Sequence, residues 1–203
     1  MMKKSFFMKT YNFNIYLMLF SLLTGFLGCS LSFLASNLDL TLPIALDLSQ
    51  VNSYLAMGSH YAYMAMSYLL GTLFASVTLE VLNRIRFDNL FNYFKSIYHT
   101  FKLRNFLTQR EKSEKITTID HQTITTYNPI NGSFNRCAHK SVVDIQKDEV
   151  TVFIKVPRDQ QGQKVLGDMT SQLKEEVSSQ HPDYYFSAPN RVRNSLWLVG
   201  KRR

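Results

Sequence analysis

The sequence predicts a membrane protein: a two-helix transmembrane hairpin followed by a small cytoplasmic α+β domain with a mixed or antiparallel sheet and one main helix. Residues 10–38 and 53–79 contain no Asp, Glu, Lys or Arg. Each run is long enough to cross a bilayer core of about 30 Å at about 1.5 Å per helical residue. From residue 116 onward, β-branched segments alternate with one amphipathic helix, which is typical of an α+β domain.

The charges around the two runs predict their orientation. Lys3, Lys4 and Lys9 precede the first run, and residues 84–115 hold eight basic and three acidic residues. The segment between the runs carries acids only, Asp39 and Asp47. Because basic flanks stay in the cytoplasm, we expect a multi-pass protein of the cell membrane with both its N-terminus and its C-terminal domain inside.

Residues 1–82 are expected to form the hairpin, with helices at about 13–36 and 54–80. Small residues recur at three- and four-residue steps on both helices, and such ridges let helices approach closely in lipid. The residues are Ser21, Gly25, Gly28 and Ser32 on the first helix, and Gly58, Ala62 and Ala65 on the second. The same ridges suit a homo-oligomer, and the sequence leaves that open. Cys29 follows a poor lipoprotein cleavage box, so we expect it to be a buried helical residue without a lipid.

Residues 83–115 predict a basic amphipathic juxtamembrane helix and a charged linker. Aromatic and apolar residues fall at three- and four-residue steps on one face: Phe87, Leu90, Phe91, Phe94, Tyr98 and Phe101. Basic residues are interleaved: Arg84, Arg86, Lys95, Lys102 and Arg104. The pattern favours contact with the anionic headgroups of a lipid bilayer. The alternative is contact with nucleic-acid phosphates.

Residues 116–203 are expected to form the cytoplasmic domain and to fold without the membrane part. Strands are predicted at 141–145 and 150–156, a helix at 164–180, and strands at 183–188 and 195–201, with a strand pair in front at 115–119 and 123–127. We expect Trp197, in the most apolar segment, to be buried.

Motifs of catalytic chemistry are missing from the sequence. It has no phosphate-binding loop, dinucleotide-binding fingerprint, nucleophile elbow or zinc-protease motif. Cys137 and His139 have a spacing that structural zinc sites do not commonly use. The expectation is therefore a protein without enzymatic activity, metal or cofactor.

One resemblance rests on the plan of the chain and on residues 148–177 (DEVTVFIKVPRDQQGQKVLGDMTSQLKEEV) and 186–203 (FSAPNRVRNSLWLVGKRR). A basic N-terminus, a two-helix hairpin, a basic helix and a small α+β domain resemble the membrane-anchored front of FtsK-like coupling proteins from Gram-positive conjugative elements. The chain lacks the ATPase that follows in that family, so the resemblance implies at most an accessory subunit without a motor.

Three functions remain open from the sequence. The first is a non-enzymatic membrane-anchored adaptor in a conjugative DNA-transfer or secretion assembly, with a protein partner such as an ATPase or a secretion component. The second is a membrane-tethered nucleic-acid binder that uses Arg191, Arg193, Arg202 and Arg203. The third is a membrane effector with a ligand-sensing domain.

Overall fold

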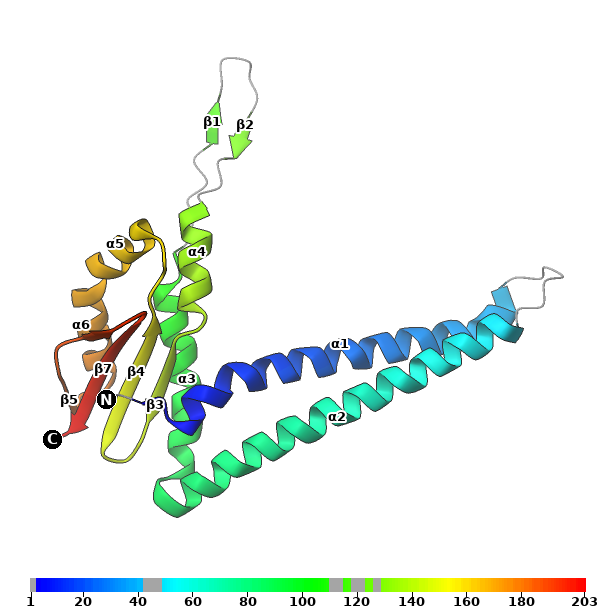
Figure 1. The fold of residues 1–203 in the computed structure, drawn as a ribbon, viewed down its shortest axis with the longest axis horizontal. Helices are drawn as coiled ribbons and strands as arrows, with labels where there is room; N and C mark the ends of the chain where they lie inside the picture. The colour runs from blue at the N-terminus through cyan, green and yellow to red at the C-terminus, as the bar shows by residue number, and fades with distance from the viewer. Residues whose placement is uncertain (1–2, 42–48, 110–114, 118–122, 126–128) are drawn as a thin grey trace. The chain divides into compact units, whose positions relative to one another are not determined.

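The structure, a computed structural model, describes residues 3–41, 49–109, 115–117, 123–125 and 129–203 (Figure 1). The chain divides into two compact units. One is a hairpin unit, Lys9–Leu82, and the other is a globular unit made of Met1–Met8 and Asn83–Arg203. Residues 42–48 of the expected outer connection (37–52) and residues 110–114 of the expected charged linker (109–115) lie outside the described residues.

Two long apolar helices dominate the first 90 residues. Helix α1 runs Phe6–Thr41 and α2 runs Ser49–Phe87, so both extend beyond the predicted bounds. Both are long and apolar enough to cross a membrane, with mean hydropathy 2.0 and 1.5 in their most apolar windows. Only 17% and 6% of those windows is buried, whereas a core helix of a soluble protein would be mostly covered.

Within the hairpin unit, the glycines of one helix lie against large side chains of the other. A Cβ atom on Gly28 would lie 3.0 Å from Cε1 of Tyr63, and one on Gly25 would lie 2.9 Å from Sδ of Met66. Gly58 lies against Leu31, where the corresponding distance is 3.3 Å. The two helices therefore pack by placing large side chains of one helix against glycines of the other.

The other residues of the two small-residue ridges are placed unequally. Ser21 and Ala62 are buried, Ser32 is half-buried and Ala65 is exposed. Cys29, expected to be buried, is exposed.

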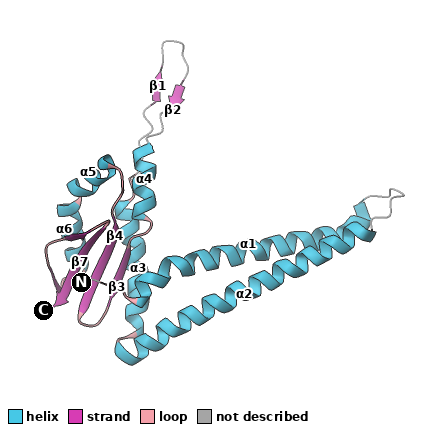
Figure 2. Ribbon diagram, in the orientation of Figure 1, coloured by secondary structure: helices cyan, strands magenta, loops and turns pink. Residues whose placement is uncertain are grey.

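The globular unit is a small antiparallel sheet covered by helices (Figure 2). The strand order is β3-β4-β7-β5, and β6 also pairs with β7. The strands are β3 Val142–Ile145, β4 Glu149–Lys155, β5 Tyr184–Phe186, β6 Asn190–Val192 and β7 Ser195–Arg202. The helices are α3 Leu90–Leu107, α4 Pro129–Ala138, α5 Gln160–Asp168 and α6 Thr170–Gln180, and a separate strand pair is β1 Lys115–Thr117 with β2 Thr123–Thr125.

The hydrophobic core lies between one face of the sheet and helices α3 to α6. Val150, Val152 and Ile154 alternate along β4 and belong to this core. Leu103 and Leu107 of α3 belong to it as well. The expected boundary at residue 115 therefore falls inside the globular unit, and α3 is one of its core elements.

Two local predictions differ from the structure. The helix expected at 164–180 is two helices, which meet at Met169. Pro129 begins α4, although the turn-favouring residues Asn128-Pro129 and Asn131-Gly132 predict turns there. Proline is well suited to the first helical position because its N–H would be unpaired there in any case.

The opposite face of the sheet carries Phe153 and Trp197, whose rings meet edge to face at 5.1 Å. Trp197 is buried, as expected. The N-terminal residues of the globular unit cover part of this face, with Nζ of Lys4 lying 3.6 Å from the centre of the Phe153 ring. Phe7 is buried and packs edge to face on Tyr93 of α3 at 5.7 Å. Both faces of the sheet are therefore apolar.

Candidate functional site

Helix α3 closes the free edge of the sheet. Because β3 is an edge strand, the outward backbone groups of Val143 and Ile145 have no strand partner. The Ile145 N–H donates to Oγ of Ser96 at 2.9 Å, and the Val143 N–H donates to Oγ1 of Thr100 at 2.9 Å. The Thr100 hydroxyl donates back to the Val143 carbonyl at 3.2 Å. Two hydroxyl side chains one helical turn apart thus take the place of a neighbouring strand.

Arg84 and Arg104, which we expected at the membrane surface, also bind this edge. Arg84 is 4% exposed and donates to the Ile145 carbonyl at 2.6 Å and to the Asp88 carboxylate at 2.8 Å. Its second terminal nitrogen pairs with the buried carboxylate of Asp144. Arg104 donates from Nε to the carbonyl of Ser141, just before β3, at 2.9 Å. A role at the membrane surface is thus wrong for Arg84. The Nε–H of Arg104 is used in a hydrogen bond within the globular unit.

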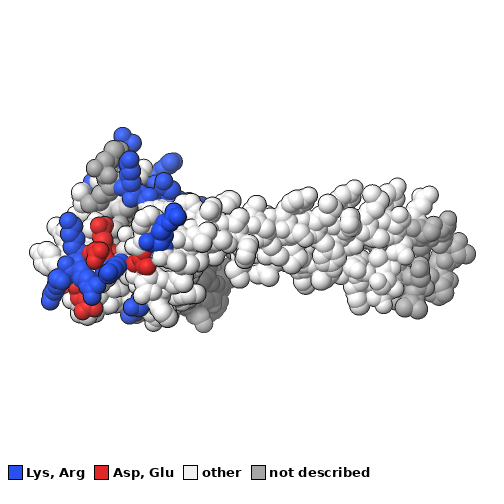
Figure 3. All heavy atoms as spheres, turned by 90° about the horizontal axis from the view of Figure 1, so that it is seen from below, with Lys and Arg blue, Asp and Glu red and all other residues white. Residues whose placement is uncertain are grey.

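The predicted aromatic face of α3 is on the surface of the globular unit. Phe91, Phe94, Tyr98 and Phe101 are between 64% and 72% exposed, and Phe87 just before the helix is 79% exposed. Exposed large aromatic side chains in a row mark a surface that something else covers. Arg86, Lys95 and Lys102 are also exposed. In the view of Figure 3, the charged side chains gather over the globular unit and the visible face of the hairpin unit is nearly free of them.

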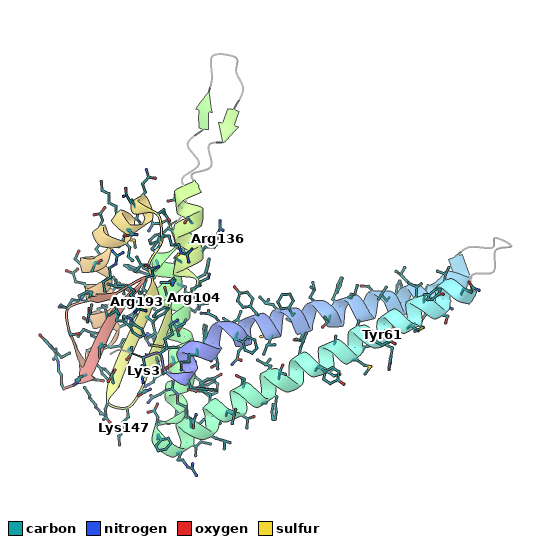
Figure 4. All side chains as sticks on the ribbon, viewed as in Figure 1. Lys3, Tyr61, Arg104, Arg136, Lys147 and Arg193 are labelled. Atoms are coloured by element: carbon teal, nitrogen blue, oxygen red, sulfur yellow. The ribbon has the colours of Figure 1, made fainter. Side chains whose placement is uncertain are left out.

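Beside this aromatic face, the globular unit contains an open groove with a volume of about 870 Å³. Its walls come from α3, the β3–β4 turn, the end of α6, the segment leading into β5, and the end of β7. The side chains that line it include Lys95, His99, Lys147, His181, Tyr184 and Arg202. Figure 4 labels Lys147 at the β3–β4 turn and Arg104 on α3.

Two histidines stand in the groove wall. The ring centres of His99 and His181 are 4.4 Å apart. Nδ1 of His99 lies 3.1 Å from Oε1 of Gln180, whose amide nitrogen donates to Glu176. Desolvation lowers the pKa of His99. Desolvation also lowers the pKa of His181 to about 4, with smaller contributions from His99 in its protonated form, Lys102 and Lys95. Both rings are therefore neutral at pH 7.

The four arginines considered for nucleic-acid contacts do not gather on one surface. Arg191 lies on β6 and Arg193 in the β6–β7 turn, next to the start of β7. Arg202 and Arg203 lie at the other end of β7. At roughly 3.3 Å per residue, the strand separates the two pairs by about 20 Å.

Cys137 lies on α4, and His139 follows the helix. Burial raises the pKa of the Cys137 thiol, which keeps it protonated at neutral pH. Across the described residues, no three His, Cys, Asp or Glu side chains gather closely enough to hold a metal ion. No protein-family model matches the chain, and no curated protein matches it significantly.

Proposed function

We propose that this protein is a two-span membrane anchor whose globular unit acts on the cytoplasmic side as a non-enzymatic adaptor, an accessory subunit of a membrane assembly. One observation carries the anchor: residues on both flanks of the hairpin, Met1–Met8 and Asn83–Arg203, pack into one compact unit. Two segments that share a core lie on the same side of a membrane. A hairpin of two spans satisfies that condition.

The exposed apolar surface of α1 and α2 supports the same proposal. Phe26 and Phe74 are each 74% exposed, and Leu23 is 63% exposed. Water around such side chains is unfavourable by about 25 cal/mol per Å² of apolar surface. A lipid bilayer covers this surface and suits the lack of charge.

The aromatic face of α3 supports a second contact with the bilayer. Phe91, Phe94 and Phe101 offer apolar surface, and Lys95 and Lys102 stand beside them to meet anionic headgroups. A basic residue near an anionic leaflet contributes about 1 kcal/mol. Of the five basic residues expected at the membrane surface from the sequence, this proposal keeps three: Arg86, Lys95 and Lys102.

The adaptor role and the kind of assembly follow from the resemblance to coupling proteins of conjugative elements. In that proposal a separate motor or secretion component binds the globular unit. Purification of the tagged protein in mild detergent, followed by mass spectrometry, should recover such a component. A nucleic-acid role has less support because the arginines lie at opposite ends of β7. The groove favours the ligand-sensing effector as the second candidate.

The topology is tested by single-cysteine labelling in intact cells. In a background with Cys29→Ser and Cys137→Ala, cysteine is placed at Lys3, at Ser53 or at Ser179, all of which are exposed. A membrane-impermeant maleimide should label only Ser53→Cys in intact cells and all three after permeabilisation. Labelling of Lys3→Cys and Ser179→Cys from opposite sides would contradict the two-span hairpin.

The bilayer contact of α3 is tested with a reporter tryptophan in vesicles that contain brominated lipids. Phe94→Trp should be quenched strongly in anionic vesicles and less in neutral ones. Tyr185→Trp is the matched control because Tyr185 is 70% exposed on β5, away from the aromatic face. The native Trp197 is buried and gives a constant background. Equal quenching of the two variants would show that α3 does not lie on the leaflet.

A further inference from the structure

We propose that the groove of the globular unit is a binding site for a phosphate ester, whose phosphate is held by Lys95, Lys147 and Arg202. All the residues involved lie in the globular unit. The inference therefore stands whether or not the adaptor proposal holds.

The first observation in support of this proposal is the set of charged side chains in the groove. Five charged side chains line it: Asp88, Lys95, Lys147, Asp183 and Arg202. The Asp88 carboxylate is already occupied, because it accepts hydrogen bonds from Arg84 at 2.8 Å, Asn92 at 2.7 Å and the Lys147 backbone N–H at 2.9 Å.

Lys95, Lys147 and Arg202 have no ion-pair partner among the described residues. These three cations outnumber the two acids of the lining, Asp88 and Asp183, so the groove has an excess of positive charge. Desolvation is the main cause of the lowered pKa of His99 and His181, and the charges of Lys102 and Lys95 lower both further.

The backbone under two of the cations is fixed in advance. The Tyr184 hydroxyl donates to the carbonyls of Gln146 and Lys147 at 3.1 and 3.3 Å, and Asp88 holds the Lys147 N–H. The Arg202 N–H donates to the carbonyl of Asp148 at 3.0 Å. Groups that are ordered before binding lose less entropy when a ligand arrives.

The size and the remaining lining indicate an ester rather than a bare anion. A volume of about 870 Å³ far exceeds one phosphate and lies within the range of about 300–1,000 Å³ usual for small-molecule sites. Ile85, Leu90, Phe91 and Pro182 supply an apolar wall for the esterified group. The guanidinium of Arg202 suits phosphate because its N–H groups match two phosphate oxygens.

Phosphate esters reach such a groove from two sources, a soluble molecule or a lipid headgroup. The full-length protein, purified in an uncharged detergent, is titrated calorimetrically with adenosine monophosphate, with inorganic phosphate and with acetate at constant ionic strength. The protein in nanodiscs is compared on phosphatidylcholine alone and on phosphatidylcholine with phosphatidic acid. We expect one of the two esters to bind, more tightly than inorganic phosphate and much more tightly than acetate.

Three variants and one matched control locate the site. Lys95→Gln, Lys147→Gln and Arg202→Gln should each weaken binding of the ester by about tenfold, the loss expected for one charge-assisted hydrogen bond. Lys164→Gln removes the same charge from an exposed position on α5, which does not line the groove, and should change affinity less than twofold. The expected near-ultraviolet circular dichroism of each variant is that of the parent protein.

Two results would overturn the proposal. One is the absence of binding by both adenosine monophosphate and phosphatidic acid. The other is an equal loss of affinity in Lys164→Gln and Lys95→Gln, which would show attraction to general surface charge. If phosphatidic acid alone binds, the site holds lipid headgroups, and if adenosine monophosphate alone binds, it holds soluble esters. Either supports the proposal.

Discussion

Arg84 and His181 are buried ionisable side chains whose charge the globular unit treats in opposite ways. Arg84 keeps its charge because two carboxylates and a backbone carbonyl surround it. His181 has no carboxylate partner in the part of the chain that the structure describes, and desolvation together with its positive neighbours keeps it neutral. The two residues therefore predict different responses to mutation and to pH.

Replacing Arg84 with Met should destabilise the globular unit by about 3–5 kcal/mol, because it leaves the buried Asp144 carboxylate without its partner. Urea unfolding monitored by Trp197, the protein's single tryptophan, measures the change. Arg86→Met, an exposed arginine two residues away, should cost less than about 0.5 kcal/mol. The double variant Arg84→Met with Asp144→Asn should recover part of the loss. A double variant as unstable as Arg84→Met alone would show that Asp144 is not what Arg84 stabilises.

Stability should fall as the pH drops from about 6.5 towards 4. The pKa of His181 is about 4 in the folded protein and about 6.5 in an unfolded chain, so the unfolded state binds the extra proton in this window. The contribution of His181 is present above pH 6.5 and is lost as the pH falls to 4, a change on the order of 2–3 kcal/mol. His99, whose pKa is also lowered, acts in the same direction.

This prediction is tested by measuring the urea concentration at the midpoint of unfolding, between pH 7 and pH 4.5, for the parent protein and for His181→Gln. Since glutamine does not titrate, its curve should be flatter than that of the parent. Parallel curves would mean that carboxylates alone cause the acid sensitivity.

At the scale of elements, α3 shows how far spacing alone predicts a helix. The aromatic row at Phe91, Phe94, Tyr98 and Phe101 follows directly from the sequence, and the structure places it on one exposed face. The packed face was not predictable in the same way. Two of its buried residues are Ser96 and Thr100, whose polarity makes sense only beside the unpaired edge of a strand that lies more than 40 residues later.

The strands of the sheet follow from local patterns more fully than the helices do. The β3–β4 hairpin and β7 match their predicted positions closely because alternating β-branched and aromatic residues suit a pleated surface. Strand β6 has three residues and was not predicted, since so short a segment has no periodicity of its own. The basic groove was not predicted either, because its cations come from α3, a turn and the end of β7.

Gly28 in α1 gives the sharpest prediction for the hairpin. Gly28→Leu should lower hairpin stability by about 1–3 kcal/mol, because a Cβ there already meets the Tyr63 ring at 3.0 Å. Gly71→Leu is the control, since nothing lies within 4 Å of the corresponding atom. Thermal unfolding in detergent micelles should separate the two variants. If both melt like the parent, Gly28 does not lie against α2 in solution.

At the scale of the whole molecule, the globular unit draws on both flanks of the hairpin. Phe7 and Met8 are buried in a unit whose other members begin 75 residues later. The sequence pattern could not predict that Phe7 and Met8 belong to the globular unit, because two apolar residues at the start of a long apolar helix are indistinguishable from the rest of that helix. The expectation that residues 116–203 fold alone omits α3 and this N-terminal segment.

A protein with residues 9–82 replaced by a short Gly-Ser linker should therefore fold as a soluble globular unit. The guanidinium carbon of Arg84 lies 5.5 Å from the Phe7 ring, so a few residues bridge the gap. We expect blue-shifted Trp197 emission and one cooperative urea transition. The control lacks residues 1–8 as well and should be less stable by about 1.5–3 kcal/mol for each large apolar side chain removed from the core. Equal stability of the two proteins would show that the N-terminal segment does not complete the fold.

The shared core of the two flanks also sets an order of events during synthesis. Residues 3–8 are synthesised before the hairpin, whereas Phe153 and Trp197, on the sheet face that they help to cover, are synthesised after it. In the proposed topology, the N-terminal segment therefore lacks these packing partners until after the hairpin has entered the membrane. A chain whose two flanks ended on opposite sides of a membrane would leave this face of the sheet uncovered, with Phe153 and Trp197 more exposed. In the proposed two-span topology, folding of the globular unit would thus report that both flanks of the hairpin had reached the same side of the membrane.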